Sequence, residues 1–138
     1  MSTDAPSGDV PVEEEHWDAA RVRGEAAHAA RGRTVLTGAA VRDGRLVAST
    51  ALHVPLAQPG RAQPGRAHQG ATLVLREHRG HRLGARTEAA VLREVAATLP
   101  AVRRISTCNS DSNRPMVAVN EALGFRRAGG LTTWSRRI

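Results

Sequence analysis

Residues 73–85 read LVLREHRGHRLGA, an apolar strand-like run that passes through a turn rich in glycine and arginine into a helical pattern. A helix that begins this way has N–H groups without intrahelical acceptors and a partial positive charge at its start. Gly80 and Gly84 allow a ligand to approach the backbone, and Arg79 and Arg82 add forked donors. The stretch predicts a phosphate or pyrophosphate site. An ordinary strand-to-helix turn with a few arginines is the alternative reading.

A second informative stretch, NSDSNRPMVAVNEALGF, covers residues 109–125. Pro115 suits the first turn of a helix and Gly124 suits its left-handed C-cap. Met116, Val119 and Leu123 form its inward stripe. Asn120 lies near that stripe, and because a buried amide needs partners, we expect it to face a cleft.

The segments between and around these stretches follow helix and strand periodicities. Asp43-Gly44 between two β-prone runs predicts a hairpin, because both central positions of a type I′ turn take positive φ. Residues 56–70 contain a direct repeat, QPGRA twice, and read as a loop. The expected elements are helices at 13–31, 85–99 and 115–123, and strands at 34–42, 45–54, 71–76, 102–108 and within 126–135. This order predicts an α/β domain with a mixed sheet in which strand 71–76 is central.

The helix at 85–99 is amphipathic. Leu92, Val95 and Leu99 recur at helical spacing, and Ala85, Ala89 and Val91 widen this face. Charged residues, including Glu88, are expected mostly on the other faces. Pro100 ends the helix.

Composition narrows the possible classes of protein. The chain has 138 residues and a net charge of +7, with 20 basic residues that are all arginine. Residues 1–12 read as a disordered tail and 13–138 as a single domain. The chain has no membrane-length apolar run or secretory signal, and Cys108 is its only cysteine, so a cytoplasmic protein is expected. No metal site and no specific nucleic-acid binding are expected, because zinc-ligand spacing and stacking aromatics are lacking.

Together, residues 73–84 and 113–125 resemble the GNAT superfamily of N-acetyltransferases, with two motifs in the right order and spacing. The likeness covers about residues 34–138 and is strongest over 72–125. It implies an acyl-CoA N-acyltransferase fold, shortened at its N-terminus by a strand and a helix. It also implies acetyl-CoA as cosubstrate.

The resemblance assigns residues to the cofactor. The turn would hold the pyrophosphate, the strand before it would pair with the pantetheine arm, and the cofactor would enter the gap between this strand and residues 105–108. The start of the last helix would also contact the cofactor. The cofactor-binding residues expected on this basis are Leu73, Val74, Leu75, Arg79, Gly80, His81, Arg82, Leu83, Gly84, Ala85, Asn113 and Asn120.

The sequence departs from the family pattern in the phosphate-binding turn and at the positions of the general acid and general base. Arg82 replaces the middle glycine of the turn, and Asn120 stands where many members carry the tyrosine that protonates the leaving thiolate. An amide cannot serve as that acid. No carboxylate lies near the start of the central strand, and His68 and His81 cannot be placed from sequence, so no catalytic residue is assigned.

The expected function is acetyl transfer to a primary amine of a small molecule or protein, by direct attack. The alternative is a degenerate domain that binds coenzyme A or a partner chain without turnover. A homodimer, or completion of the domain by another chain, would fit the shortened N-terminus.

Overall fold

A computed structural model describes residues 18–56, 65–132, 134 and 136. The elements run in the order α1 (Ala19–Ala30), β1 (Arg33–Arg42), β2 (Arg45–Pro55), β3 (Arg66–Val74), the short 3-10 helix η2 (Arg76–His78), α2 (Leu83–Thr98), β4 (Arg104–Ser106) and α3 (Arg114–Ala122). The mixed α/β architecture expected from the sequence is confirmed.

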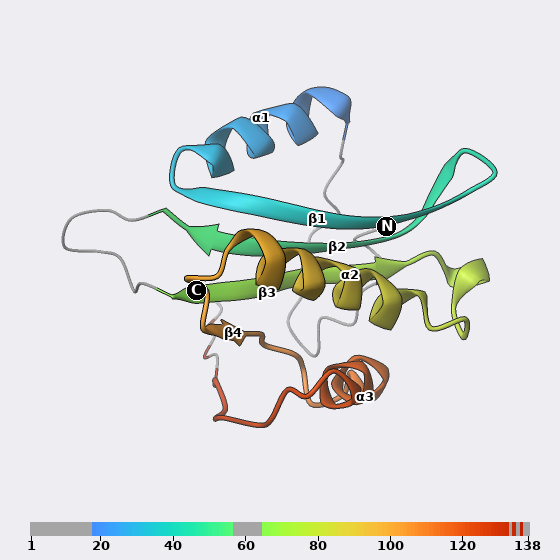
Figure 1. Ribbon diagram of the computed structural model, residues 1–138. Coiled ribbons are helices and arrows are strands. Elements are labelled where there is room, and N and C mark those ends of the chain that lie inside the picture. Colours follow the sequence, from blue (N-terminus) through green and yellow to red (C-terminus); the bar gives the residue numbers. More distant parts are fainter. Residues whose placement is uncertain (1–17, 57–64, 133, 135, 137–138) are drawn as a thin grey trace.

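The four strands form one sheet in the order β1-β2-β3-β4 (Figure 1). The pairs β1/β2 and β2/β3 are antiparallel, whereas β3 and β4 are parallel. The β1–β2 hairpin turns at Asp43 and Gly44, whose φ angles are +50° and +74°, as the predicted type I′ turn requires. Strand β3 is central, as predicted.

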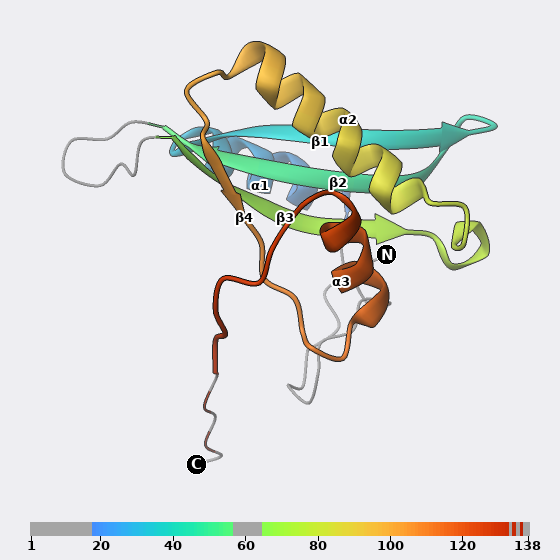
Figure 2. The same ribbon diagram turned by 60° about the horizontal axis from the view of Figure 1, so that its bottom comes forward.

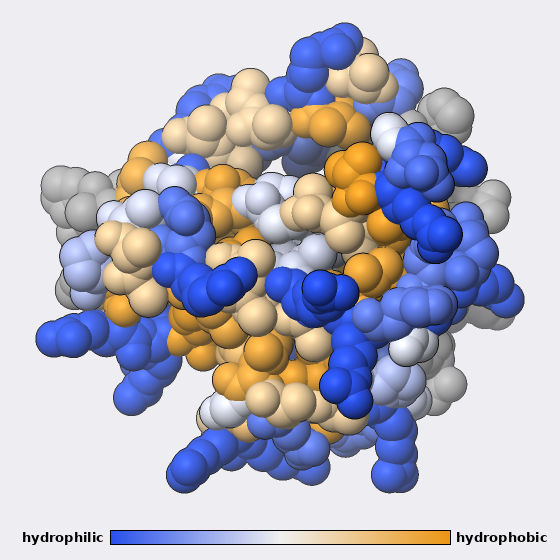
Figure 3. All heavy atoms as spheres, turned by 45° about the vertical axis from the view of Figure 1, so that its right-hand side comes forward, coloured by the Kyte–Doolittle hydropathy of each residue, from blue (hydrophilic) through white to orange (hydrophobic). Residues whose placement is uncertain are grey.

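Helix α2 lies across one face of the sheet, and α1 lies on the other side beside β1 (Figure 2). The buried apolar core between α2 and the sheet consists of Leu52, Ala67, Val91 and Val95. Helix α1 buries none of its residues, and Val22, Val35 and Val41 are exposed. Figure 3 shows apolar and weakly polar residues across the middle of one face, interrupted and surrounded by strongly hydrophilic ones.

Several predicted boundaries are wrong. Residues 66–70 belong to β3 rather than to a loop, because His68 and Gln69 pair with β2 and residues 66–68 pair with β4. Arg76 lies in η2. Strand 102–108 shrinks to Arg104–Ser106, and none of the described residues in 126–135 forms a strand.

The boundaries at the N-terminal end also differ. Helix α1 begins at Ala19, where Asp18 Oδ1 accepts the N–H of Arg21 at 2.7 Å as an N-cap. The predicted helix start at 13–17, the tail at 1–12 and most of the direct repeat lie outside the described residues. Among the described helices, none is long and apolar enough to cross a membrane.

Candidate functional site

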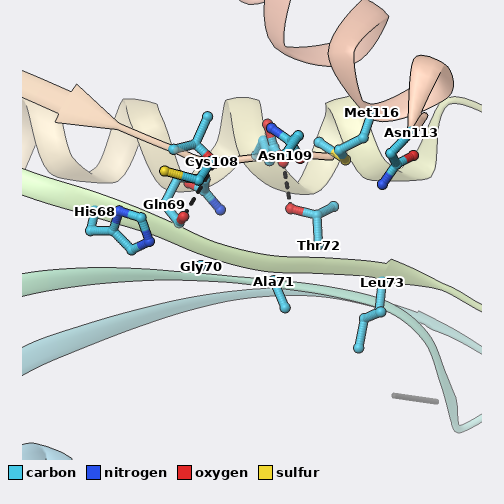
Figure 4. Close-up of a pocket in the computed structure, with 12 residues that line it drawn as sticks. His68, Gln69, Gly70, Ala71, Thr72, Leu73, Cys108, Asn109, Asn113 and Met116 are labelled. Atoms are coloured by element: carbon cyan, nitrogen blue, oxygen red, sulfur yellow. Dashed lines mark hydrogen bonds between the residues drawn. The ribbon is translucent and has the colours of Figure 1, made fainter. Parts of the chain in front are cut away.

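A cleft opens where β3 and β4 separate. The two strands pair only at Arg66/Arg104, Ala67/Ile105 and His68/Ser106. Beyond this point β3 continues without β4 beside it, and a cavity of about 290 Å³ lies between β3, α2, the segment after β4 and the start of α3 (Figure 4). Its lining residues are His68, Gln69, Gly70, Ala71, Thr72, Leu73, Glu88, Thr107, Cys108, Asn109, Asn113 and Met116.

A β-bulge lies beside this cleft. Thr72 is paired with Thr50 and Gln69 with Leu52, so Gly70 and Ala71 of β3 together face Ala51 alone. The bulge increases the local bend and twist of β3 where β4 leaves it. A Cβ on Gly70 would lie 2.8 Å from Nε2 of His53, which explains the glycine.

The bulged strand presents backbone amides to the cleft. The N–H of Leu75 donates to the carbonyl of Val47 at 2.9 Å, so this residue pairs with β2. Backbone N–H groups of successive residues in a strand point alternately to its two edges. The amides of Thr72 and Val74 therefore point to the opposite edge of β3, which is open. Of the three strand residues expected to hold the cofactor, Val74 therefore offers an amide there, and Leu73 lines the cleft.

The turn expected to bind phosphate forms the N-terminus of α2. Gly80 has φ +80°, and Arg82, the N-cap residue, has φ +56° and makes no side-chain cap. The N–H of Arg86 donates to the carbonyl of Arg82 at 3.0 Å, which is the first helical bond. The amides of residues 83–85 therefore have no acceptor within the helix, and they carry the positive end of its dipole.

None of the turn residues 79–85, which were expected at the cofactor, lines the cleft itself. Nε of Arg79 donates to the carbonyl of Val74 at 3.2 Å, which ties the turn to the end of β3. Nδ1 of His81 lies 2.9 Å from the carbonyl of Arg79, and His81 does not line the cleft. Gly84 packs against β3, since its Cβ would lie 3.5 Å from Cγ2 of Thr72.

The two asparagines expected at the cofactor have different environments. Asn113 precedes α3, makes no side-chain cap and lines the cleft beside Met116. Asn120 is buried and does not line the cleft, and its Oδ1 has no hydrogen-bond partner among the described residues. Only Asn113 lies where it could touch a ligand in the cleft.

Glu88 is the cleft residue that the sequence analysis misplaced. It lies on the buried face of α2, in register with Gly84, Val91 and Val95, and is only 1% exposed. The expectation that it lies away from the core is therefore wrong. A carboxylate in the i, i+4, i+7 register of small and apolar residues was the available signal. Cys108 and Asn109 were also missed, because their position depends on where β4 ends.

Glu88 belongs to a chain of buried polar side chains. The hydroxyl of Thr72 donates to Oε1 of Glu88, and Oγ1 of Thr50 lies 2.7 Å from Oγ1 of Thr72. Nε2 of Gln69 donates to Oγ1 of Thr50 at 2.6 Å. Oε2 of Glu88 has no partner among the described residues. Burial raises the pKa of Glu88 above its usual value, and the hydrogen bond from Thr72 opposes this only in part.

This raised pKa makes the stability of the fold depend on pH. The stabilisation from protonated Glu88 is complete below the unfolded-state pKa of about 4.5 and is lost as pH rises through the folded-state pKa. We expect Glu88→Gln to gain stability relative to the wild type across that window. Urea unfolding of both chains between pH 4.5 and 8 measures this difference. A constant difference would contradict the raised pKa.

No metal site is apparent in the part of the chain that the structure describes, where no three His, Cys, Asp or Glu side chains group suitably. Among the titratable residues of the cleft are His68 and Cys108, which is a free and exposed thiol. The cleft therefore combines an open strand edge and a buried carboxyl group. The N-terminus of α2 lies outside its lining, against Thr72 and Val74 of β3.

Comparison with known proteins identifies this arrangement. The model of the Acetyltransferase (GNAT) family matches residues 3–125. The chain belongs to the GNAT acetyltransferase family. No curated protein sequence matches this GNAT chain significantly.

Solved structures of acetyltransferases resemble this GNAT chain. A tandem GNAT protein from the clavulanic acid biosynthesis pathway is 38% identical, with a TM-score of 0.67 over 76% of this chain and 32% of that one. The chain thus spans about a third of that protein. The aminoglycoside N-acetyltransferase AAC(6')-Iy in complex with CoA is 17% identical, with a TM-score of 0.64, over 86% of this chain and 88% of that one.

An acetyltransferase of Trypanosoma brucei is 18% identical to this GNAT chain, with a TM-score of 0.69, over 91% of this chain and 84% of that one. At such low identity, this structure and the aminoglycoside enzyme show a shared fold. The predicted family and fold are confirmed.

Proposed function

We propose that the chain is an acetyl-CoA-dependent N-acetyltransferase that moves the acetyl group to a primary amine. The observation that carries this proposal is the separation of β3 from β4 beside the start of α2. This geometry brings an open strand edge, the amides at the start of α2 and a cleft of about 290 Å³ onto one side of the molecule. An extended molecule with a phosphate end and an amide-containing arm matches these groups.

In this proposal, the residues expected from the sequence bind different parts of acetyl-CoA. The amides of residues 83–85 bind the pyrophosphate, with Arg79 and Arg82 adding charge-assisted hydrogen bonds. The pantetheine arm extends along the open edge of β3 towards the bulge. Asn113 contacts the arm from the α3 side, where it lines the cleft.

The reaction proposed is direct attack by a neutral amine on the thioester carbon. An amide on the open edge of β3, such as that of Val74, stabilises the negative charge that forms on the carbonyl oxygen. Holding the two reactants in contact supplies much of the rate acceleration. The acceptor is a small molecule or a protein amine.

One observation favours a second candidate function, a degenerate domain that binds coenzyme A or a partner chain without turnover. Asn120, which replaces the tyrosine of many relatives, is buried and does not line the cleft. The family's usual acid is therefore lacking at that position. If the degenerate domain binds coenzyme A, both candidates bind acetyl-CoA. Only the enzyme acetylates an amine, so an acetylation assay separates them.

Acetyl-CoA is expected to bind with a Kd of about 1 μM or tighter, measured by calorimetry. It is also expected to slow alkylation of Cys108, the only cysteine, by about tenfold, because this exposed thiol lines the cleft. Maleimide labelling followed by mass spectrometry measures that rate.

The control for this labelling moves the thiol to another surface. In the double variant Cys108→Ser/Ala26→Cys, the cysteine lies on the exposed surface of α1, and acetyl-CoA should leave its alkylation unchanged. If calorimetry detects no binding and Cys108 is not protected, the cofactor proposal is wrong. Binding without acetylation of any amine in a broad panel would favour the second candidate.

A further inference from the structure

The buried carboxyl group of Glu88 has no role in the function proposed so far. It lines the cleft from α2, although the residue is only 1% exposed, and its Oε2 lacks a partner among the described residues. Buried polar atoms almost always have a hydrogen-bond partner, so this carboxyl oxygen, like Oε1 of Gln69 in the same cleft, is available to a water or a ligand there.

The hydrogen bonds around Glu88 fix which oxygen is available. The Thr72 hydroxyl donates to Oε1, and as that hydroxyl has a single proton, the Thr50 hydroxyl donates to Thr72. The Thr50 hydroxyl in turn accepts from Nε2 of Gln69. The two hydroxyl protons of this chain therefore point towards Oε1, while Nε2 of Gln69 also donates to the carbonyl of Ala51 at 3.1 Å. When Glu88 is protonated, its proton lies on Oε2.

Thr72 links Glu88 to the position of the thioester. Its hydroxyl contacts Glu88, while its backbone amide points to the open edge of β3. A thioester whose carbonyl oxygen accepts from the amide of Val74 lies on the same edge as Thr72, two residues away along β3. Thr72 contacts Glu88 through its hydroxyl and forms part of this edge through its backbone. A thioester held along the edge would therefore have its scissile C–S bond close to the carboxyl group of Glu88.

We propose that Glu88 is the general acid of this cleft and protonates the coenzyme A thiolate as it leaves; this inference rests on the acetyltransferase function proposed above. The C–N bond forms as the C–S bond breaks, and the electron pair of that bond stays on sulfur. The proton on Oε2 passes to sulfur. The amine loses its extra proton to water, and a proton from solvent restores Glu88.

Two features of the surroundings support this role. Burial raises the pKa of Glu88, which keeps the group protonated to higher pH than an exposed glutamate. The other groups near Glu88 are neutral: Thr50 of β2, which contacts Thr72, Asn113 before α3 and Met116 of α3. His68 on β3 and Cys108 after β4 are the titratable groups that share the cleft with Glu88.

The central test compares wild type with Glu88→Gln, which keeps the size of the side chain but has no acidic proton. Thiol release from acetyl-CoA is followed with a panel of primary amines comprising an aminoglycoside, a polyamine and a lysine peptide. We expect kcat to fall about 100-fold while KM for acetyl-CoA stays within about twofold. Glu94→Gln, on an exposed position of the same helix, is the matched control and should retain wild-type rates.

The pH profile distinguishes an acid from a structural residue. The wild-type kcat should fall as pH rises through the pKa of Glu88, which gives the pH profile a descending limb. The profile of Glu88→Gln should lack this limb. Thr72→Val removes the hydrogen bond that lowers the pKa of Glu88, so the limb should move to higher pH. A merely structural role would leave the position of the limb unchanged.

A binding measurement gives a readout without turnover. Acetyl-CoA in the cleft would exclude water from Glu88 and raise the pKa of this carboxyl group further. At a pH near the pKa of Glu88 in the unliganded protein, binding should therefore be accompanied by proton uptake. Calorimetry in two buffers of different ionisation enthalpy measures this uptake, which Glu88→Gln should abolish. Uptake that persists in the variant contradicts the inference.

The outcomes separate the two proposals. Failure of the wild type to bind acetyl-CoA, or binding without thiol release on any amine of the panel, overturns the acetyltransferase function and the role of Glu88 with it. Thiol release that Glu88→Gln leaves unchanged overturns the role of Glu88 alone.

Discussion

Reversing the charge of both Arg79 and Arg82 to glutamate is expected to weaken acetyl-CoA binding by about 100-fold or more. Each arginine lies at the turn before α2, next to three amides without helical acceptors. A hydrogen bond to a charged group contributes roughly 1.5–3 kcal/mol, and an acidic side chain also repels the phosphates. Titration calorimetry of the double variant measures the loss.

The control for this variant is a second charge reversal, Arg23→Glu/Arg93→Glu, at exposed positions on α1 and the outer part of α2. It changes the net charge of the chain by the same amount, so it separates the local site from the general attraction of a basic protein for an anion. Wild-type affinity is expected for the control. Equal losses in both double variants would show that the turn has no special role.

Arg82 has a conformational cost as well as a charge. At φ +56° it holds a left-handed conformation that L-residues adopt at a cost of about 1 kcal/mol and that glycine adopts freely. A glycine at this position, as in the family pattern, would adopt this conformation without that cost. The strain is retained in Arg82→Glu, so the charge reversal should change binding far more than stability.

The local signals in the sequence predict the elements whose structure is determined locally. Asp43-Gly44 specifies its turn because both residues must take positive φ, and the pattern around Val91 and Val95 specifies α2. Pro115 and Gly124 mark the ends of α3 in the same way, with Gly124 at φ +89°. Each of these features depends on contacts within a few residues.

The missed features depend on pairing between distant segments. The polar run at residues 66–70 reads as a loop, but it pairs with β2 on one side and with β4 on the other. Its Gln69 also enters a buried hydrogen-bond network. Glu88 reads as a surface residue because charge normally stays in water. Only the three-dimensional structure brings it against Thr72, where a hydroxyl can satisfy one of its oxygens.

Replacing Gly38 with valine is expected to lower the free energy of unfolding by about 3 kcal/mol, a large share of the stability of a small domain. Gly38 lies in β1 where α2 crosses the sheet. A Cβ there would lie 2.8 Å from both the Thr87 carbonyl oxygen and Cγ2 of Val91. Because one of these two atoms belongs to the backbone of α2, the helix itself must move to accommodate any side chain.

Gly24→Ala on α1 is the matched control for this substitution, because a Cβ at Gly24 would have no other atom within 4 Å. Alanine in a helix interior is favoured over glycine by about 0.5–1 kcal/mol, so this variant should become slightly more stable. Urea unfolding of Gly38→Val, Gly38→Ala and Gly24→Ala should therefore give a large loss, a smaller loss and a gain. Comparable midpoints for all three would show that α2 does not need close contact with β1.

Displacement of α2 also has a consequence for the site. Thr87, whose carbonyl would meet the new side chain, immediately precedes Glu88, so a helix pushed away from β1 carries Glu88 with it. Gly38→Ala, the milder variant, should remain folded and yet show a disturbed Glu88–Thr72 contact. Its difference in stability from the wild type should then change between pH 4.5 and 8, whereas that of Gly24→Ala should stay constant.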